Sequence, residues 1–139
     1  VYTSLIDPEY LVVYKLVFGI SAVIGHIFPI YVGFRGGKGI ATLLGMVLSI
    51  HIEAALVCFL IFCIVLLLSK YVSLGSMMAA LAFPILLMLP RFNPEEPLVV
   101  IFGFAIFSVV ILTHQKNIIR LINGEENKAK IRIRSRHRN

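Results

Sequence analysis

The sequence has few charged residues, only two cysteines and no tryptophan. Aspartate, glutamate, lysine and arginine make up 14% of the 139 residues, whereas a soluble domain carries about a quarter. Hydrophobic residues make up 59% of the chain, and the mean hydropathy is +0.95. This composition excludes an ordinary water-soluble domain and is typical of an integral membrane protein.

The two cysteines do not indicate a disulfide or a metal site. Cys58 and Cys63 are five positions apart in one apolar run, so on a helix they point in different directions. We interpret both as small packing residues. The histidines and carboxylates also lack the spacing of metal ligands, so the sequence predicts no metal site.

Five apolar segments follow one another along the chain, at residues 10–33, 40–50, 53–69, 72–90 and 97–113. Four of them are long enough, or nearly so, to cross the ~30 Å hydrocarbon core of a bilayer. Residues 40–50 are too few, because eleven helical residues rise only about 16 Å. We therefore expect an all-α, polytopic integral membrane protein with about five membrane segments, one of them short.

The basic residues predict the orientation of these segments. If residues 40–50 and 53–69 form separate helices, the chain changes sides at every break. One side then receives Arg35, Lys38, Lys70 and the chain from Lys116 onward, which holds eight of the thirteen basic residues. The other side receives the acidic residues Asp7, Glu9, Glu53, Glu95 and Glu96. Basic residues favour the cytoplasm, so we expect an external N-terminus and a cytoplasmic C-terminus.

This topology brings polar residues from four separate stretches to the cytoplasmic interface. His26 lies near the inner end of the first segment, directly before the "RGGKG" loop. Ser73 and Ser76 begin the fourth segment, and His114 and Asn117 follow the fifth. We interpret this convergence as a candidate functional site.

The "RGGKG" loop has the composition of an anion-binding turn. Gly36, Gly37 and Gly39 let backbone N–H groups approach a ligand closely. The helix expected next adds unpaired N–H donors and a partial positive charge. Arg35 and Lys38 add full positive charges suited to phosphate. The alternative is an ordinary interfacial turn with basic residues facing the cytoplasm.

His114 and Asn117 are three positions apart, so they share a face if the helix continues. A histidine exchanges a proton near neutral pH, and an asparagine can orient it or hold a phosphate oxygen. The alternative is a pair of interface residues without a catalytic role. His26 equally fits a packing role, and Ser73 and Ser76 equally fit a helix N-cap.

The tail "KAKIRIRSRHRN" alternates basic residues with small or apolar ones. We expect it to be disordered and attracted to anionic lipid. It has no interleaved aromatic residues for base stacking, so a nucleic-acid partner is not expected. The predicted organisation is a membrane domain at 1–113, a cytoplasmic segment at 114–127 next to the site, and the basic tail at 128–139.

Residues 25–42, "GHIFPIYVGFRGGKGIAT", closely resemble the second signature of the bacterial acyl-phosphate:glycerol-3-phosphate acyltransferases, the PlsY family. The resemblance continues through "KYVSLGSM" and through the H-x-x-N-I-x-R-L-x-x-G-x-E-x-K pattern that ends at Lys128. It implies a seven-helix protein of the bacterial inner membrane with its active site open to the cytoplasm. The implied reaction transfers an acyl group from acyl phosphate to the 1-hydroxyl of glycerol 3-phosphate, an early step of phospholipid synthesis. Its products are lysophosphatidic acid and phosphate, and no metal or nucleotide is implied.

The resemblance implies that the loop binds a substrate phosphate through Gly36, Gly37, Lys38 and Gly39, with Arg35 beside them.

Ser73 matches the serine of the family's "SL" stretch, so it is preferred to Ser76. His114 and Asn117 match the polar pair of the third signature and are the implied catalytic residues, with Ser73. His26 and Ser76 are supporting candidates. Whether His114 or a substrate phosphate takes the hydroxyl proton stays open at this point.

Two alternatives remain. Nothing in the sequence matches the family's first helix, its first signature or its second helix, and the chain begins with Val1. The five segments would then correspond to the last five of seven helices, and one alternative is an inactive fragment. The other is a transporter or anion-binding protein that uses the same loop. A transporter predicts charges along a path, whereas Lys15 and Glu53 both lie near the outer face.

Overall fold

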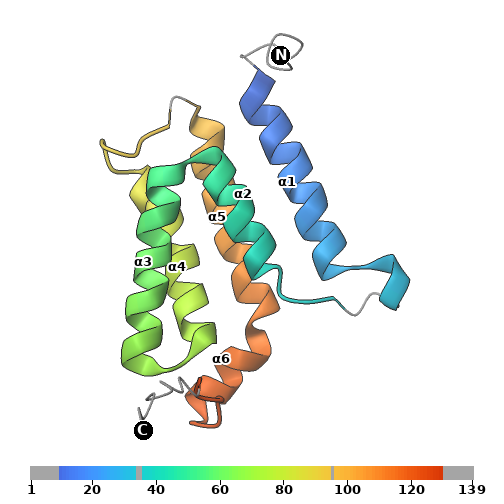
Figure 1. Cartoon of the computed structure of the whole chain (residues 1–139), viewed down its shortest axis with the longest axis vertical. Coiled ribbons are helices and arrows are strands. Elements are labelled where there is room, and N and C mark those ends of the chain that lie inside the picture. Colours follow the sequence, from blue (N-terminus) through green and yellow to red (C-terminus); the bar gives the residue numbers. More distant parts are fainter. Residues whose placement is uncertain (1–9, 34–35, 95, 130–139) are drawn as a thin grey trace, which may run out of the picture.

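The computed structural model describes residues 10–33, 36–94 and 96–129, and all regular structure within these ranges is helical (Figure 1). The fold class is therefore all-α, as the sequence predicts. The elements are α1 (Leu11–Ile27), the short 3-10 helix η3 (Ile30–Val32), α2 (Ile40–Ile50), α3 (Ile52–Ser69), α4 (Val72–Leu87), α5 (Pro97–Thr113) and α6 (Gln115–Ile122).

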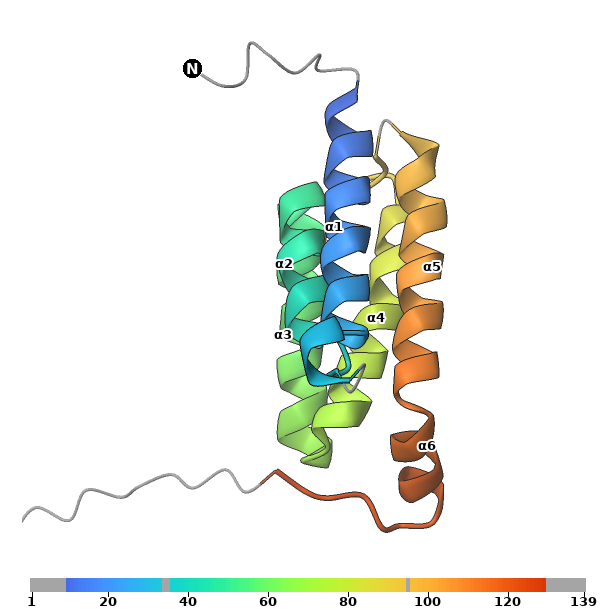
Figure 2. The same cartoon turned by 90° about the vertical axis from the view of Figure 1, so that its right-hand side faces the viewer.

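Helices α1 to α5 run alternately in opposite directions, and α6 follows at the end of α5 (Figures 1 and 2). The loop before α2, the α3–α4 turn and α6 lie at one end of the bundle. We call this the basic end, because its described segments carry Lys38, Lys70, Lys116, Arg120 and Lys128. The α2–α3 and α4–α5 turns lie at the opposite end.

Residues 40–50 and 53–69 form separate helices, as the basic residues predict. α2 ends at Ile50, and His51 between the helices is extended, with φ −147° and ψ 91°. The His51 ring caps α3, because its Nδ1 accepts a hydrogen bond from the Ala54 N–H at 3.3 Å. A short loop thus reverses the chain and keeps α2 apart from α3.

Two predicted apolar segments are longer than the helices that they contain. Within residues 10–33, α1 ends at Ile27 and η3 follows. Pro29 explains this break, because proline lacks an N–H group and disfavours helical geometry at the residue before it. The fourth segment was expected to reach residue 90, whereas α4 ends at Leu87.

The helices have the length and surface of membrane segments. Residues Leu11–Val32 and Ile52–Ser69 are each long and apolar enough to cross a membrane. α5 and α6 together form a third candidate span, bent by 63°, and α2 and α4 are shorter apolar helices. Large apolar side chains point outward along the bundle, among them Phe18 and Ile101. Such a surface is suited to lipid rather than water.

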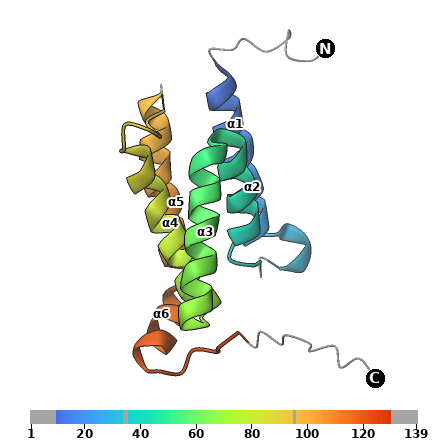
Figure 3. The same ribbon diagram turned by 60° about the vertical axis from the view of Figure 1, so that its left-hand side comes forward.

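Small residues bring the helices close together. Ala54 and Ala55 of α3 are completely buried. A Cβ atom at Gly103 of α5 would lie 3.2 Å from the Cα of Pro84 in α4, so the two backbones nearly touch. Close packing over small residues is typical of membrane helices. Figure 3 shows the resulting arrangement: α3 lies in the middle, α1 and α2 lie on one side of it, and α4 and α5 lie on the other side.

Candidate functional site

The glycine loop packs tightly against the end of α1. A Cβ atom at Gly36 would overlap the carbonyl oxygens of His26 and Ile27. The Gly37 N–H donates to the His26 oxygen at 3.3 Å. Gly39 has φ +74° and is the N-cap of α2, a conformation that favours glycine. The glycines therefore hold the loop against α1 and turn it into α2.

Lys38 is exposed between these glycines, one residue before the N-cap of α2. His26 supports the same loop, because a side chain at Gly37 would meet its ring Nε2 at 2.6 Å. Arg35 lies outside the described residues. The His26 ring thus packs against the loop at Gly37. The phosphate-binding role of the loop stays a prediction.

Ser73 and Asn117 meet at one carboxylate. The Ser73 hydroxyl and the Asn117 amide nitrogen each donate to Glu126 Oε1 at 2.6 Å. The two donors come from the first turn of α4 and the first turn of α6. Their side chains are 4% and 7% exposed. The topology therefore brings the two predicted residues together.

Ser73 does not act as a helix N-cap, so that alternative is wrong for this residue. Tyr71 is the N-cap of α4, and no side chain caps the helix there. Ser76 is buried and donates to the Val72 carbonyl at 3.0 Å. It lies one turn further into α4 than Ser73.

His114 lies at the junction of α5 and α6 and is 1% exposed. Its Nδ1 lies 2.8 Å from the Val110 carbonyl oxygen. Because a carbonyl can only accept, Nδ1 carries the hydrogen, and in the neutral ring Nε2 carries the lone pair. Burial lowers the pKa of His114, the Lys38 charge lowers it further, and the Val110 bond and Glu126 oppose this. The neutral ring is therefore favoured.

One helix does not continue through His114 and Asn117, so the condition for a shared helix face is not met. α5 and α6 meet at 63°, and the His114 carbonyl accepts from the Asn117 N–H at 2.8 Å. Both side chains are nevertheless buried. The bend, rather than a shared helix face, places them at the same end of the bundle.

Glu126 is the site residue that the sequence reasoning missed. Its contact with Ser73 spans 53 positions, so no local pattern predicts it. The one available signal is its place as the glutamate of the H-x-x-N-I-x-R-L-x-x-G-x-E-x-K pattern. The hydrogen bonds from Ser73 and Asn117 lower the pKa of Glu126, and the charges of Arg120 and Lys38 lower it further. The charge of Lys38 thus lowers the pKa of both His114 and Glu126.

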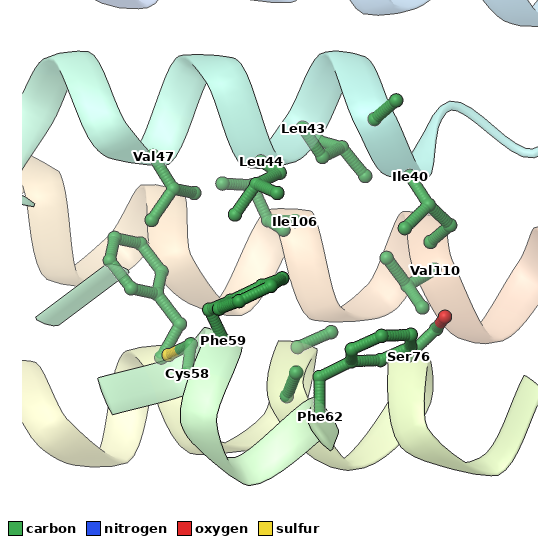
Figure 4. A pocket seen from close by; sticks show the side chains of 14 residues that line it. Ile40, Leu43, Leu44, Val47, Cys58, Phe59, Phe62, Ser76, Ile106 and Val110 are labelled. Carbon is green, nitrogen blue, oxygen red and sulfur yellow. The ribbon is translucent and has the colours of Figure 1, made fainter. Parts of the chain in front are cut away.

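An apolar cavity of about 390 Å³ lies between α2, α3, α4 and α5. Figure 4 shows Ser76, Ile40 and Val110 at one end of it and Val47 and Cys58 at the other. The first end is next to the polar cluster, because Ser76 and Val110 are each one helical turn from Ser73 and His114. A second cavity of the same volume lies between α1, α2 and α5, and its lining ends at Thr113.

These features define an all-helical membrane protein with buried polar groups at one end of an apolar cavity. The family described as glycerol-3-phosphate acyltransferase matches residues 1–124. The chain belongs to this family, as its resemblance to the PlsY signatures predicts.

Individual relatives agree in sequence and structure. The chain is 36% identical to a glycerol-3-phosphate acyltransferase of Chlorobium phaeobacteroides (strain BS1), with 84% of this chain and 59% of that protein covered. It is 40% identical to one of Salinibacter ruber, with 88% and 55% covered. The crystal structure of PlsY, an integral membrane glycerol 3-phosphate acyltransferase, in its glycerol 3-phosphate form, matches with a TM-score of 0.75 and 34% identity. That match covers 81% of this chain and 55% of PlsY.

The lysophosphatidic acid form of PlsY matches similarly, with a TM-score of 0.74. Together these matches make the chain an integral membrane protein of the PlsY fold. The chain spans between half and two thirds of the length of these relatives.

Proposed function

We propose that this protein transfers an acyl group from acyl phosphate to glycerol 3-phosphate, giving lysophosphatidic acid and phosphate. The carrying observation is the cluster of Ser73, His114 and Asn117 at the end of an apolar cavity, in a chain that belongs to this family. Relatives with solved structures include PlsY in a glycerol 3-phosphate form and a lysophosphatidic acid form, which agrees with a phosphate-bearing acceptor and a lipid product.

The polar cluster suits a reaction between two anions. Acyl phosphate is already activated, so the protein mainly has to bring together two phosphates that repel each other. Lys38 supplies positive charge, the first turn of α2 supplies N–H donors, and Ser73 and Asn117 supply side-chain donors. In this proposal the loop of Gly36, Gly37, Lys38 and Gly39 binds one substrate phosphate, with Arg35 beside it.

His114 is the proposed proton acceptor. The glycerol hydroxyl attacks the acyl carbonyl carbon, the new ester C–O bond forms, and the bond to the phosphate oxygen breaks. The hydroxyl proton passes to His114 Nε2, and phosphate leaves with the electron pair. Two observations support this role. The Nδ1 bond to Val110 fixes the tautomer that has its lone pair on Nε2, and the pKa of His114, lowered mainly by burial, favours the neutral ring. The alternative acceptor is the phosphate of the acyl donor.

The cavity beside the cluster is the proposed site of the acyl chain. Its lining is apolar except for Ser76, and it begins one helical turn from Ser73 and His114. A chain that lies there would place its carbonyl group at the polar cluster. The same lining speaks against a transporter, because an ion path requires polar groups along its length.

The proposed location is the bacterial inner membrane, as the family resemblance implies, and the basic residues support an orientation with the basic end in the cytoplasm. In the described part of the chain, Lys38, Lys70, Lys116, Arg120 and Lys128 lie at that end, whereas Lys15 and Arg91 lie toward the opposite end. Positive charge favours the cytoplasmic side. Glycerol 3-phosphate and acyl phosphate would then enter from the cytoplasm, and the product would pass into membrane lipid.

The test is product formation by the longest native form of the protein in lipid. We expect lysophosphatidic acid to form from acyl phosphate and glycerol 3-phosphate, and to decrease at least tenfold in Lys38→Ala. If Lys38→Ala forms as much product as the wild type, the proposed reaction stands and the proposed role of Lys38 is overturned. A folded wild-type protein that forms no product would overturn the proposed function.

A further inference from the structure

Glu126 holds the two donors that the proposed function assigns to a phosphate. Its Oε1 accepts from both Ser73 and Asn117 at 2.6 Å. Its Oε2 is buried and has no hydrogen-bond partner in the described part of the chain. A buried carboxylate oxygen without a partner is costly, so this carboxylate is incompletely satisfied where it lies.

The Ser73 hydroxyl cannot serve Glu126 and a phosphate at the same time, whereas the Asn117 amide has a second hydrogen. A serine hydroxyl has one hydrogen and donates to one acceptor at a time. The Ser73 hydroxyl therefore leaves Glu126 if it binds a phosphate oxygen. A phosphate next to the ionised carboxylate would also be repelled, since the pKa of Glu126 is lowered and the group stays charged.

We propose that the Glu126 carboxylate competes with a substrate phosphate for Ser73 and Asn117 and leaves these donors when the phosphate binds. This inference rests on the proposed function, because it takes Ser73 and Asn117 as phosphate ligands. Glu126 is then an internal stand-in for the substrate anion, and its departure is part of substrate binding.

The position of Glu126 allows this exchange. It lies beyond the end of α6, in a segment without regular structure. That segment is also held by the Ala129 N–H, which donates to the Lys70 carbonyl at 2.7 Å. The carboxylate can therefore turn away without breaking a helix. The positive charges of Arg120 and Lys38 both lower the pKa of Glu126, so these cations are near enough to stabilise the displaced carboxylate.

The experiment measures the KM of the longest native form in lipid nanodiscs, for glycerol 3-phosphate and for acyl phosphate separately. Glu126→Gln keeps the size of the side chain and one acceptor oxygen but removes the charge that repels phosphate. We expect the KM for one of the two substrates to fall several-fold, and that substrate is the one whose phosphate displaces Glu126. Glu125→Gln, at the exposed neighbouring position, is the control and should change neither KM.

An unchanged or raised KM for both substrates in Glu126→Gln would overturn the competition and leave Glu126 as a group that only positions Ser73 and Asn117. The rise in Tm at saturating glycerol 3-phosphate gives a readout that does not depend on turnover. Competition predicts a larger rise in Glu126→Gln than in the wild type if that substrate is the competitor. A wild type that forms no product would instead overturn the proposed function, so the two failures are distinguishable.

Discussion

The two ends of the bundle differ in how far their polar side chains are exposed. At the opposite end, Glu53 and Arg91 form an ion pair at 3.7 Å with side chains 60% and 77% exposed. At the basic end, Ser73, His114 and Asn117 are almost fully buried. An exposed ion pair contributes only about 0.2–1 kcal/mol, whereas burying polar groups costs free energy unless they are bonded.

The opposite end is explained by folding alone. His51 caps α3, its ring lies 6.0 Å from that of Phe92, and the Arg91 guanidinium lies over Phe92. These contacts tie the α2–α3 turn to the α4–α5 turn. The buried cluster at the basic end includes a carboxylate oxygen without a partner, which stability alone does not require. The contrast therefore supports the proposal that the chemistry takes place at the basic end.

The largest expected effect contrasts two histidines, one at each end. His114→Ala should lower kcat by about 10²–10⁴-fold, the usual contribution of a general base. His51→Ala should leave kcat nearly unchanged and lower the free energy of unfolding by about 1 kcal/mol, as loss of a helix cap does. Product assays and chemical unfolding in lipid check both. Equal losses of activity in the two variants would contradict the contrast.

The pH profile sharpens the role of His114. Its pKa is lowered from the usual value of about 6.5, and a base must be neutral to act. Activity should therefore stay constant as the pH falls from 8 to about 6.5, and decrease only below that range. A decrease that is complete above pH 6.5 would contradict the neutral, buried ring.

The second effect contrasts two glycines. Gly36→Ala places a Cβ atom against two backbone oxygens of α1, whereas Gly45→Ala in α2 meets nothing within 4 Å. Overpacking of this kind costs about 1–3 kcal/mol, and the loop must shift to relieve it. We expect kcat/KM for glycerol 3-phosphate to fall at least tenfold in Gly36→Ala and to stay within twofold in Gly45→Ala. Equal activities would show that the loop tolerates displacement.

A smaller effect contrasts the two cavities. Ala80→Phe fills the cavity beside Ser76, and Ala105→Phe fills the one between α1 and α5. If the first cavity holds the acyl chain, Ala80→Phe should shift the preference toward shorter acyl phosphates by several-fold, and Ala105→Phe should not. Competition between long and short donors measures this preference. A shift in Ala105→Phe alone would move the acyl chain to the second cavity.

The smallest effect is expected at the exposed ion pair. Arg91→Gln should change the free energy of unfolding by less than about 1 kcal/mol and leave product formation unaltered. Chemical unfolding and the product assay are the measurements. A large loss of activity would mean that the opposite end also takes part in function.

Much of the fold could be predicted from the sequence because its boundaries are local. The predicted segments 40–50 and 97–113 have the same bounds as α2 and α5. Both starts can be predicted, because glycine is suited to the left-handed N-cap at Gly39 and proline is favoured in the first helical turn, as at Pro97. The separation of α2 from α3 followed from the basic residues and is confirmed. The early end of α1 was missed although Pro29 signals it, because the apolar run continues past the proline.

The candidate site was only partly predictable. The convergence of Ser73, His114 and Asn117 followed from alternation of the helices across the membrane. Glu126 could not be found in this way, because its partners are distant in sequence. The packing of Gly36 against α1 was also invisible, since it depends on where the chain returns in space. Hydrophobic patterns thus place helices, whereas contacts between loops require the folded chain.

Binding of glycerol 3-phosphate tests the central claim most directly. Isothermal titration of the longest native form in nanodiscs should show saturable binding in the wild type and in Arg91→Gln. The same titration should show binding at least tenfold weaker in Asn117→Ala. Equal affinity in Asn117→Ala and the wild type, with both proteins folded, would contradict the assignment of the glycerol 3-phosphate site to the buried cluster at the basic end.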